Sequence, residues 1–128
     1  MNKKNKMLLT ASVAVVLVVA CYFVLRSHFQ QQGAEEYLKD FRTEGEVLKY
    51  IPPEGYVPDK KTAISIAVAV WEPIYGKEQI AGEAPYQANL VDGVWVVSGS
   101  LPGLSIGGTA KALIKKDTGE ILQVIHEM

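Results

Sequence analysis

The hydrophobic pattern divides the chain into an apolar N-terminal run and a longer body with mixed polarity. The run extends over 19 residues from Met7 to Leu25 and is interrupted only by Thr10 and Ser12. As a helix it would be about 28 Å long, close to the thickness of a bilayer's hydrocarbon core. Lysines concentrated before the run place the N-terminus in the cytoplasm by the positive-inside rule. We therefore expect residues 1–26 to be a single-pass anchor in a bacterial inner membrane, with the body in the periplasm.

A second export signal overlaps the end of this run. The segment Val18–Cys21 resembles a bacterial lipobox, in which the cysteine is lipidated and becomes the first residue of the mature protein. The sequence stays hydrophobic from Tyr22 to Leu25, where a lipoprotein normally turns polar, and this favours an uncleaved span. The alternative is a lipoprotein-type signal with Cys21 as the lipidation candidate. Both place the body on the same side of the membrane.

Residues 27–54 are predicted to be a polar linker. Within it, Tyr37, Leu38 and Phe41 recur at spacings of three and four residues. This spacing is compatible with a short amphipathic helix, and a solvated tether is the alternative. The run Pro52–Gly55 then stops any regular structure.

A strong helix signal follows at the start of the body. Asp59 can cap the first turn directly after Pro58, and an apolar stripe follows it. The stripe consists of Ile64, Ala67, Val68 and Trp71, and Ile66, Ala69 and Val70 make the neighbouring face nearly as apolar. We expect this helix to reach Pro73 and to add one turn that stops at Gly76.

After Gly76 the periodicity changes to that of strands. The predicted segments are a short edge strand at Glu78–Ile80 and longer strands at Pro85–Val91, Val94–Val97, Thr109–Lys115 and Ile121–His126, with turns at Asp92–Gly93 and Asp117–Gly119. The predicted fold class is α+β. An N-terminal membrane helix precedes a small domain in which a helix covers an antiparallel meander.

Charge and composition exclude several classes of protein. Residues 1–26 carry four basic and no acidic side chains, whereas residues 27–128 carry nine basic and 14 acidic ones. Because phosphate binding needs a clustered basic surface, nucleic acid is not the expected partner. A single cysteine excludes an intramolecular disulfide, and two histidines, His28 and His126, leave little for a metal site. We expect neither a cofactor nor a metal.

The glycine-rich stretch Gly103–Gly108 invites comparison with a phosphate cradle. It lacks the lysine of a P-loop and lies between two predicted strands, whereas a P-loop precedes a helix. Glycines in a tight crossover are the simpler interpretation. The tip of this loop, Leu104, Ser105 and Ile106, would then be an exposed protein-binding feature.

Candidate catalytic groups are sparse. A set of Ser105, His126 and Asp117 is conceivable but matches no nucleophile motif. Glu72 and His126 are the ionisable side chains whose positions would best suit an enzyme. We predict no enzymatic activity.

The aromatic residues Trp71, Tyr75, Tyr86 and Trp95 are expected to form the core between helix and sheet. The alternative is a concave apolar pocket lined by Trp71, Tyr86 and Trp95.

Several of these segments together resemble a known family. The most specific is the block Trp71–Gly76, which reads W-E-P-I-Y-G, and it is accompanied by Tyr56–Asp59, Val94–Gly99, Lys115–Leu122 and His126. Over about residues 55–128 the chain is similar to the bacterial nuclear-transport-factor-2-fold immunity proteins. The resemblance implies a small cone-shaped α+β domain that neutralises a cognate toxin by binding it, without catalysis.

The predicted function is accordingly an immunity protein that occludes a cognate protein toxin acting in the periplasm. As contact residues we select Tyr75 and Glu72 together with the tip Leu104, Ser105 and Ile106. A periplasmic module that binds a small molecule or lipid in an apolar pocket is the alternative. A PepSY-like inhibitory module and an enzyme that depends on Glu72 or His126 are further alternatives.

Overall fold

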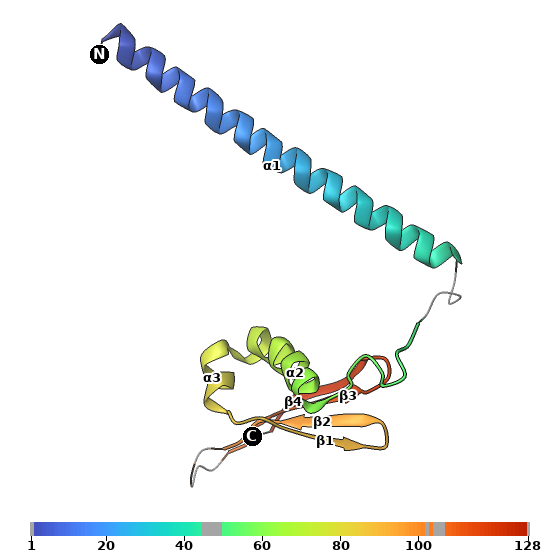
Figure 1. The fold of residues 1–128 in the computed structure, drawn as a ribbon. Coiled ribbons are helices and arrows are strands. Elements are labelled where there is room, and N and C mark those ends of the chain that lie inside the picture. The colour runs from blue at the N-terminus through green and yellow to red at the C-terminus, as the bar shows by residue number, and fades with distance from the viewer. Residues whose placement is uncertain (1, 45–49, 102, 104–106, 128) are drawn as a thin grey trace. The chain divides into compact units, whose positions relative to one another are not determined.

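The computed structural model describes residues 2–44, 50–101, 103 and 107–127, and it divides into two compact units, residues 1–49 and 50–128 (Figure 1). The first unit contains α1 (Lys3–Glu44), one continuous helix that includes the apolar run and the polar residues after it. The stretch around Tyr37–Phe41 is therefore helical. By length and composition α1 could cross a membrane, and a signal sequence meets the same criteria.

In the second unit, α2 (Lys60–Tyr75) begins where the capping pattern predicts. Asp59 has an extended backbone, and its carboxylate accepts a hydrogen bond from the Thr62 N–H at 2.8 Å. This bond holds the pKa of Asp59 below its usual value. The helix passes through Pro73 and stops at Gly76, whose N–H donates to the Glu72 carbonyl at 2.9 Å.

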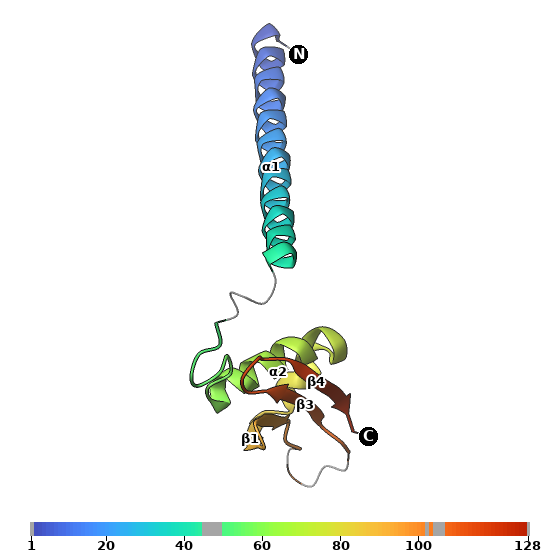
Figure 2. The ribbon, with the colours of Figure 1, turned by 90° about the vertical axis from the view of Figure 1, so that its right-hand side faces the viewer.

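The next element is α3 (Lys77–Gly82), and the edge strand predicted at Glu78–Ile80 was wrong. Three residues are too few to define a periodicity, and lysine, glutamate, glutamine and alanine favour a helix. The helical turn bonds the Ile80 N–H to the Gly76 carbonyl at 3.1 Å and buries Ile80 completely. Figure 2 shows α2 lying along one face of the sheet.

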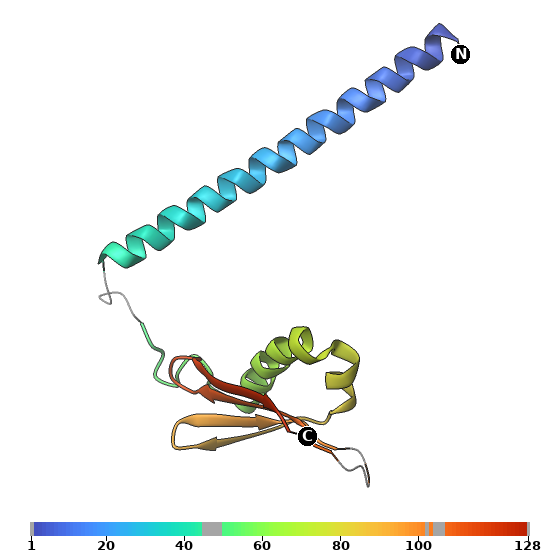
Figure 3. The same ribbon diagram turned by 180° about the vertical axis from the view of Figure 1, so that it is seen from behind.

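The four strands form the predicted antiparallel meander, in the order β1-β2-β3-β4 (Figure 3). They are β1 (Gln87–Val91), β2 (Val94–Ser98), β3 (Ala110–Lys115) and β4 (Ile121–His126). Asp92 and Gly93 connect β1 to β2 with φ angles of 47° and 77°, as a two-residue hairpin turn requires. β1 and β4 are the two edges of this sheet.

The core lies between α2, α3 and the sheet, and small residues of α2 allow the helix to approach the strands closely. Trp71 and Trp95 are both part of it, exposed by 0 % and 5 %, so they occupy the core position that the sequence favoured. Its buried members are Val57, Ala63, Ala67, Trp71, Ile80, Ala88, Trp95, Val97, Ala110, Ala112 and Ile114.

The segment leading into the domain is bonded to the turn between β3 and β4. The N–H groups of Tyr56 and Val57 donate to the carbonyls of Asp117 and Lys116, each at 3.0 Å. A further hydrogen bond connects this segment to the core: the indole N–H of buried Trp95 donates to the Val57 carbonyl at 2.8 Å. Gly55, at φ 78°, packs so closely on the Lys116 backbone that a Cβ would clash there. The first residues of the domain are thus fixed by backbone hydrogen bonds.

The two tryptophans allow a matched test of this contact. Trp95→Phe removes the donor to the buried Val57 carbonyl, whereas the Trp71 indole N–H is buried with no partner among the described residues. Because an unpaired buried acceptor is costly, we expect Trp95→Phe to lower the free energy of unfolding by about 1 kcal/mol more than Trp71→Phe. Urea unfolding of the full chain in detergent measures this, and each variant retains one tryptophan as fluorophore. Equal losses would contradict it.

Candidate functional site

One of the predicted contact residues, Tyr75, lies beside the end of β4. Glu72 and Tyr75 belong to the last turn of α2, and the Tyr75 ring lies 5.2 Å from the His126 imidazole, centroid to centroid. Ile74, between them in the sequence, is 57 % exposed, and the Gln79 amide nitrogen is 3.2 Å from His126 Nε2. We call these five residues the α2–α3 corner. They come from α2, α3 and the end of β4, and they include the exposed side chain of Ile74 and the two adjacent rings of Tyr75 and His126.

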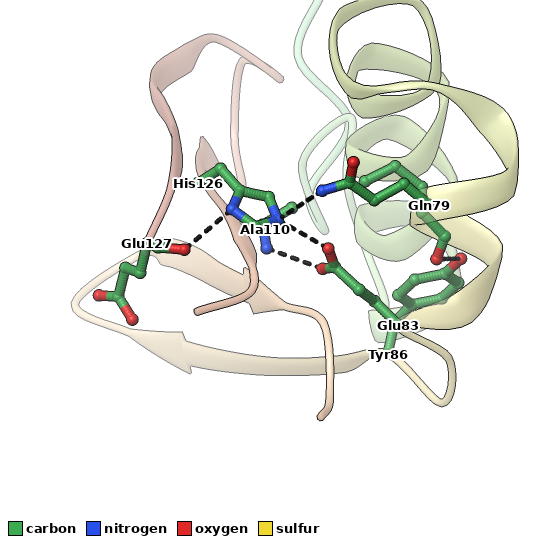
Figure 4. A network of polar contacts seen from close by, with 7 residues as sticks. Gln79, Glu83, Tyr86, Ala110, His126 and Glu127 are labelled. Carbon is green, nitrogen blue, oxygen red and sulfur yellow. Dashed lines mark hydrogen bonds and ion pairs between the residues drawn. The ribbon is translucent and has the colours of Figure 1, made fainter. Parts of the chain in front are cut away.

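A buried carboxylate holds this corner in place (Figure 4). Glu83, directly after α3, exposes only 9 % of its side chain, and its Oε1 lies 2.8 Å from His126 Nε2. Its Oε2 accepts a hydrogen bond of 2.8 Å from the Ala110 N–H. One side chain thus joins the end of α3, the start of β3 and the end of β4. A buried charge is costly unless it is paired and hydrogen-bonded, so Glu83 depends on both partners.

The two nitrogens of the His126 ring are both engaged. Nδ1 lies 2.9 Å from the backbone carbonyl of Glu127, which can only accept, so Nδ1 carries a hydrogen. Nε2 lies 2.8 Å from Glu83 Oε1. With both nitrogens bonded within the protein, the imidazole is built to hold β4 against α3. This arrangement favours a positioning role for His126 over acid–base chemistry.

Two glycines make room for this network. A Cβ at Gly99 would clash with the Glu83 side chain, and one at Gly108 would clash with the backbone of Glu127. Between these two glycines, Ser100 donates its N–H to the Glu83 carbonyl at 2.7 Å. In the connection between β2 and β3, close packing thus explains Gly99 and Gly108, whereas a Cβ at Gly103 or Gly107, with φ angles of 63° and 151°, would meet open space.

Tyr86 lies behind the same corner. Its hydroxyl donates to the Ile80 carbonyl at 2.7 Å, and its ring centroid is 6.0 Å from that of Trp71. Burial, and then the negative charges of Glu72 and Glu83, raise the pKa of the Tyr86 phenol above its usual value. The hydroxyl therefore stays protonated as a donor over a wide pH range.

A groove of about 430 Å³ lies at the other end of the sheet. It is lined by Ile51–Gly55, Asp92–Val94 and Lys115–Asp117. The three aromatics of the alternative pocket, Trp71, Tyr86 and Trp95, do not line this groove, and both tryptophans are core residues. Among the described residues, no three His, Cys, Asp or Glu side chains gather as a metal site would require.

The structure separates the conceivable catalytic set. Asp117 precedes β4 and His126 ends it, so the two lie at opposite ends of that strand, and His126 pairs with Glu83 instead. The predicted contact tip Leu104, Ser105 and Ile106 lies outside the described residues. Sequence reasoning missed Glu83. In the sequence, only its small neighbours Gly82 and Ala84 distinguish this glutamate from the acidic residues that are exposed. Cys21, the lipidation candidate, is an exposed position of α1.

A scan against protein-family models matches residues 62–128, just over half of the chain, to a family described as NTF2 fold immunity protein. The chain belongs to this family. The match confirms the family that the W-E-P-I-Y-G block indicated, and the α+β fold agrees with it. The matched part of this NTF2 fold immunity protein includes both Glu83 and His126. Comparison with curated proteins and with solved structures gave no match.

Removing the buried carboxylate should destabilise this immunity protein. Glu83→Ala leaves the Ala110 N–H without its acceptor, so we expect the free energy of unfolding to fall by about 2 kcal/mol. Glu83→Gln keeps an acceptor for Ala110 and should cost less. Glu78→Ala, at an exposed position of α3, is the matched control. Urea unfolding of the full chain in detergent compares the three variants. Equal effects of Glu83→Ala and Glu78→Ala would refute the stabilising role of the hydrogen bond between Ala110 and Glu83.

Tyr86→Phe tests the phenol. Loss of the bond to the Ile80 carbonyl should cost about 1 kcal/mol at neutral pH. Because the folded-state pKa is raised, the wild type keeps its full contribution from Tyr86 below the ordinary pKa of 10.0 and loses it as the pH rises through the folded value. The difference between the two proteins should therefore shrink at alkaline pH. Urea midpoints of both proteins, measured from neutral to alkaline pH, check this. A difference that stays constant would contradict the raised pKa of Tyr86.

Proposed function

We propose that this chain is an immunity protein that binds a cognate toxin in the periplasm and neutralises it by occlusion. Membership of the immunity family over residues 62–128 carries the proposal. The location is supported by α1, which is long and apolar enough to span the inner membrane and is preceded by lysines. An uncleaved span is the proposed form, with lipidation at Cys21 as the alternative.

The α2–α3 corner is the surface that we assign to the toxin. Exposed Ile74 and half-buried Tyr75 would supply its apolar contacts, and Glu72 and Gln79 would supply polar ones. A central apolar or aromatic anchor with a polar rim is the usual arrangement at protein interfaces. The tip Leu104–Ile106, outside the described residues, stays a proposed additional contact.

The buried network supports this assignment because it makes the corner rigid. Tyr75 packs on the His126 ring, and both nitrogens of that ring are bonded within the domain. A surface ordered before binding loses little conformational entropy when its partner arrives. Occlusion needs such a surface and no reacting group.

The test uses two matched substitutions and, as the candidate toxin, the product of a gene that lies beside this one and encodes a secreted effector. Ile74→Asp places a charge in the corner, whereas Val91→Asp places it at the opposite end of the sheet, and the two side chains are 57 % and 54 % exposed. We expect Ile74→Asp to raise the Kd for the toxin by about 30-fold and to abolish protection of growth. Val91→Asp should change neither value.

Three outcomes would contradict the proposal at different levels. Equal protection by Ile74→Asp and the wild type would remove the corner from the interface and leave immunity intact. If a periplasm-directed toxin kills cells equally with and without the wild-type protein, immunity itself is refuted. Protection against the same toxin confined to the cytoplasm would refute the proposed compartment.

A further inference from the structure

The outer side of β1 has backbone groups that are free to bind another strand. The two-residue turn Asp92–Gly93 makes Val91 and Val94 a hydrogen-bonded pair. Because bonding residues alternate along an antiparallel ladder, the N–H and C=O groups of Ala88 and Leu90 point away from β2. In the part of the chain that the structure describes, no strand lies on that side of β1.

The sequence of β1 does not protect this edge. Native sheets usually protect an edge strand with a charged residue, a proline or a bulge. β1 reads Q-A-N-L-V, which contains neither charge nor proline, and its register with β2 is regular. β4, at the other edge, has a register shift against β3 at Leu113–Ile114. Of the two edges, β1 is therefore the one that is suited to pairing.

We propose that β1 pairs with β1 of a second copy, antiparallel, across a two-fold axis at Ala88. The two Ala88 residues then exchange N–H···O=C hydrogen bonds. On the face of the sheet away from α2, Gln87 of one copy lies opposite Asn89 of the other. Each amide can both donate and accept, so the two side chains are complementary without any charge.

The other face of β1 gives the second reason for choosing another copy as the partner. Leu90 is on the side that α2 covers, because it pairs with the core residue Trp95, yet it is 45 % exposed, against 4 % for Ala88. In the proposed register Leu90 lies opposite half-buried Tyr86 of the other copy. The dimer thus sets apolar against apolar on one face and amide against amide on the other.

The inference rests on the proposed membrane anchoring. Two five-residue strands bury far less surface than the roughly 1,600 Å² of a standard interface, so the isolated domains would associate weakly. Anchoring in one membrane raises the effective concentration of the copies. β4 is the opposite edge of the sheet, so pairing through β1 leaves Tyr75 and His126 accessible to a toxin.

Disulfide formation between two differently tagged full-length copies in membranes tests the register. Gln87→Cys in one copy lies opposite Asn89→Cys in the other, with Cβ atoms about 5 Å apart, whereas either variant is diagonal to itself at about 7–8 Å. The shorter separation suits a disulfide and the longer one does not. We expect the mixed pair to give at least about five times more disulfide dimer than either variant alone.

The matched control is Gln123→Cys, an exposed position on β4, mixed with Asn89→Cys, and the wild type gives the background from Cys21. Equal yields from the mixed pair and this control would overturn the proposal. A higher yield from either variant alone would indicate a different register, and would also overturn it.

Charge variants test the pairing without added cysteines. Gln87→Lys with Asn89→Lys sets lysine opposite lysine at two places, whereas Gln87→Lys with Asn89→Glu sets lysine opposite glutamate. Both positions are exposed. We expect co-purification of two tagged copies in mild detergent to fall at least about five-fold for the first variant and to persist for the second.

Equal co-purification of the two charge variants would overturn the proposal. Capture of a different protein at β1, without a second copy of this chain, would assign the edge to that protein and would likewise overturn it. Pairing by a chain that gives no protection against the toxin would refute immunity and leave this inference standing.

Discussion

The carboxylate of Glu83 determines how the functional end of the domain is assembled. Buried after α3, it meets the first amide of β3 with one oxygen and the imidazole at the end of β4 with the other. At such a position the carboxylate depends on these two partners, so the three elements are bound to one another through a single side chain. The orientation of His126, and with it the packing of Tyr75, follows from this arrangement.

The glycines near this carboxylate show how backbone and charge are matched. Gly99 and Gly108 lie where a side chain would collide with Glu83 or with the end of β4. Gly99 is therefore explained by the space that the buried acid needs, and Gly108 by the close approach of the backbone that follows β4. In the stretch that resembles a ligand loop in the sequence, Gly108 is explained by its close approach to the Glu127 backbone.

The sequence predicted what depends on local signals and missed what depends on distant ones. Asp59 predicts the start of α2, and the alternating pattern with the Asp92–Gly93 turn predicts the meander. Both signals are local, because capping and periodicity act between near neighbours. The strand predicted at Glu78–Ile80 is part of the six-residue helix α3. A single buried residue, Ile80, is not enough to show a helical periodicity. Glu83 became visible only when the fold placed residues 110 and 126 beside it, at separations of 27 and 43 residues.

The hydrogen bonds at the start of the domain also determine where a force on the preceding chain would act. Gly55, Tyr56 and Val57 lie against the β3–β4 turn, and the Val57 carbonyl continues to the indole of Trp95 in the core. A pull on the chain ahead of Gly55 would load these hydrogen bonds before it reached any strand of the sheet. The domain is thereby fastened at its turn end, and the corner formed by α2 and α3 is left unloaded when the tether is strained.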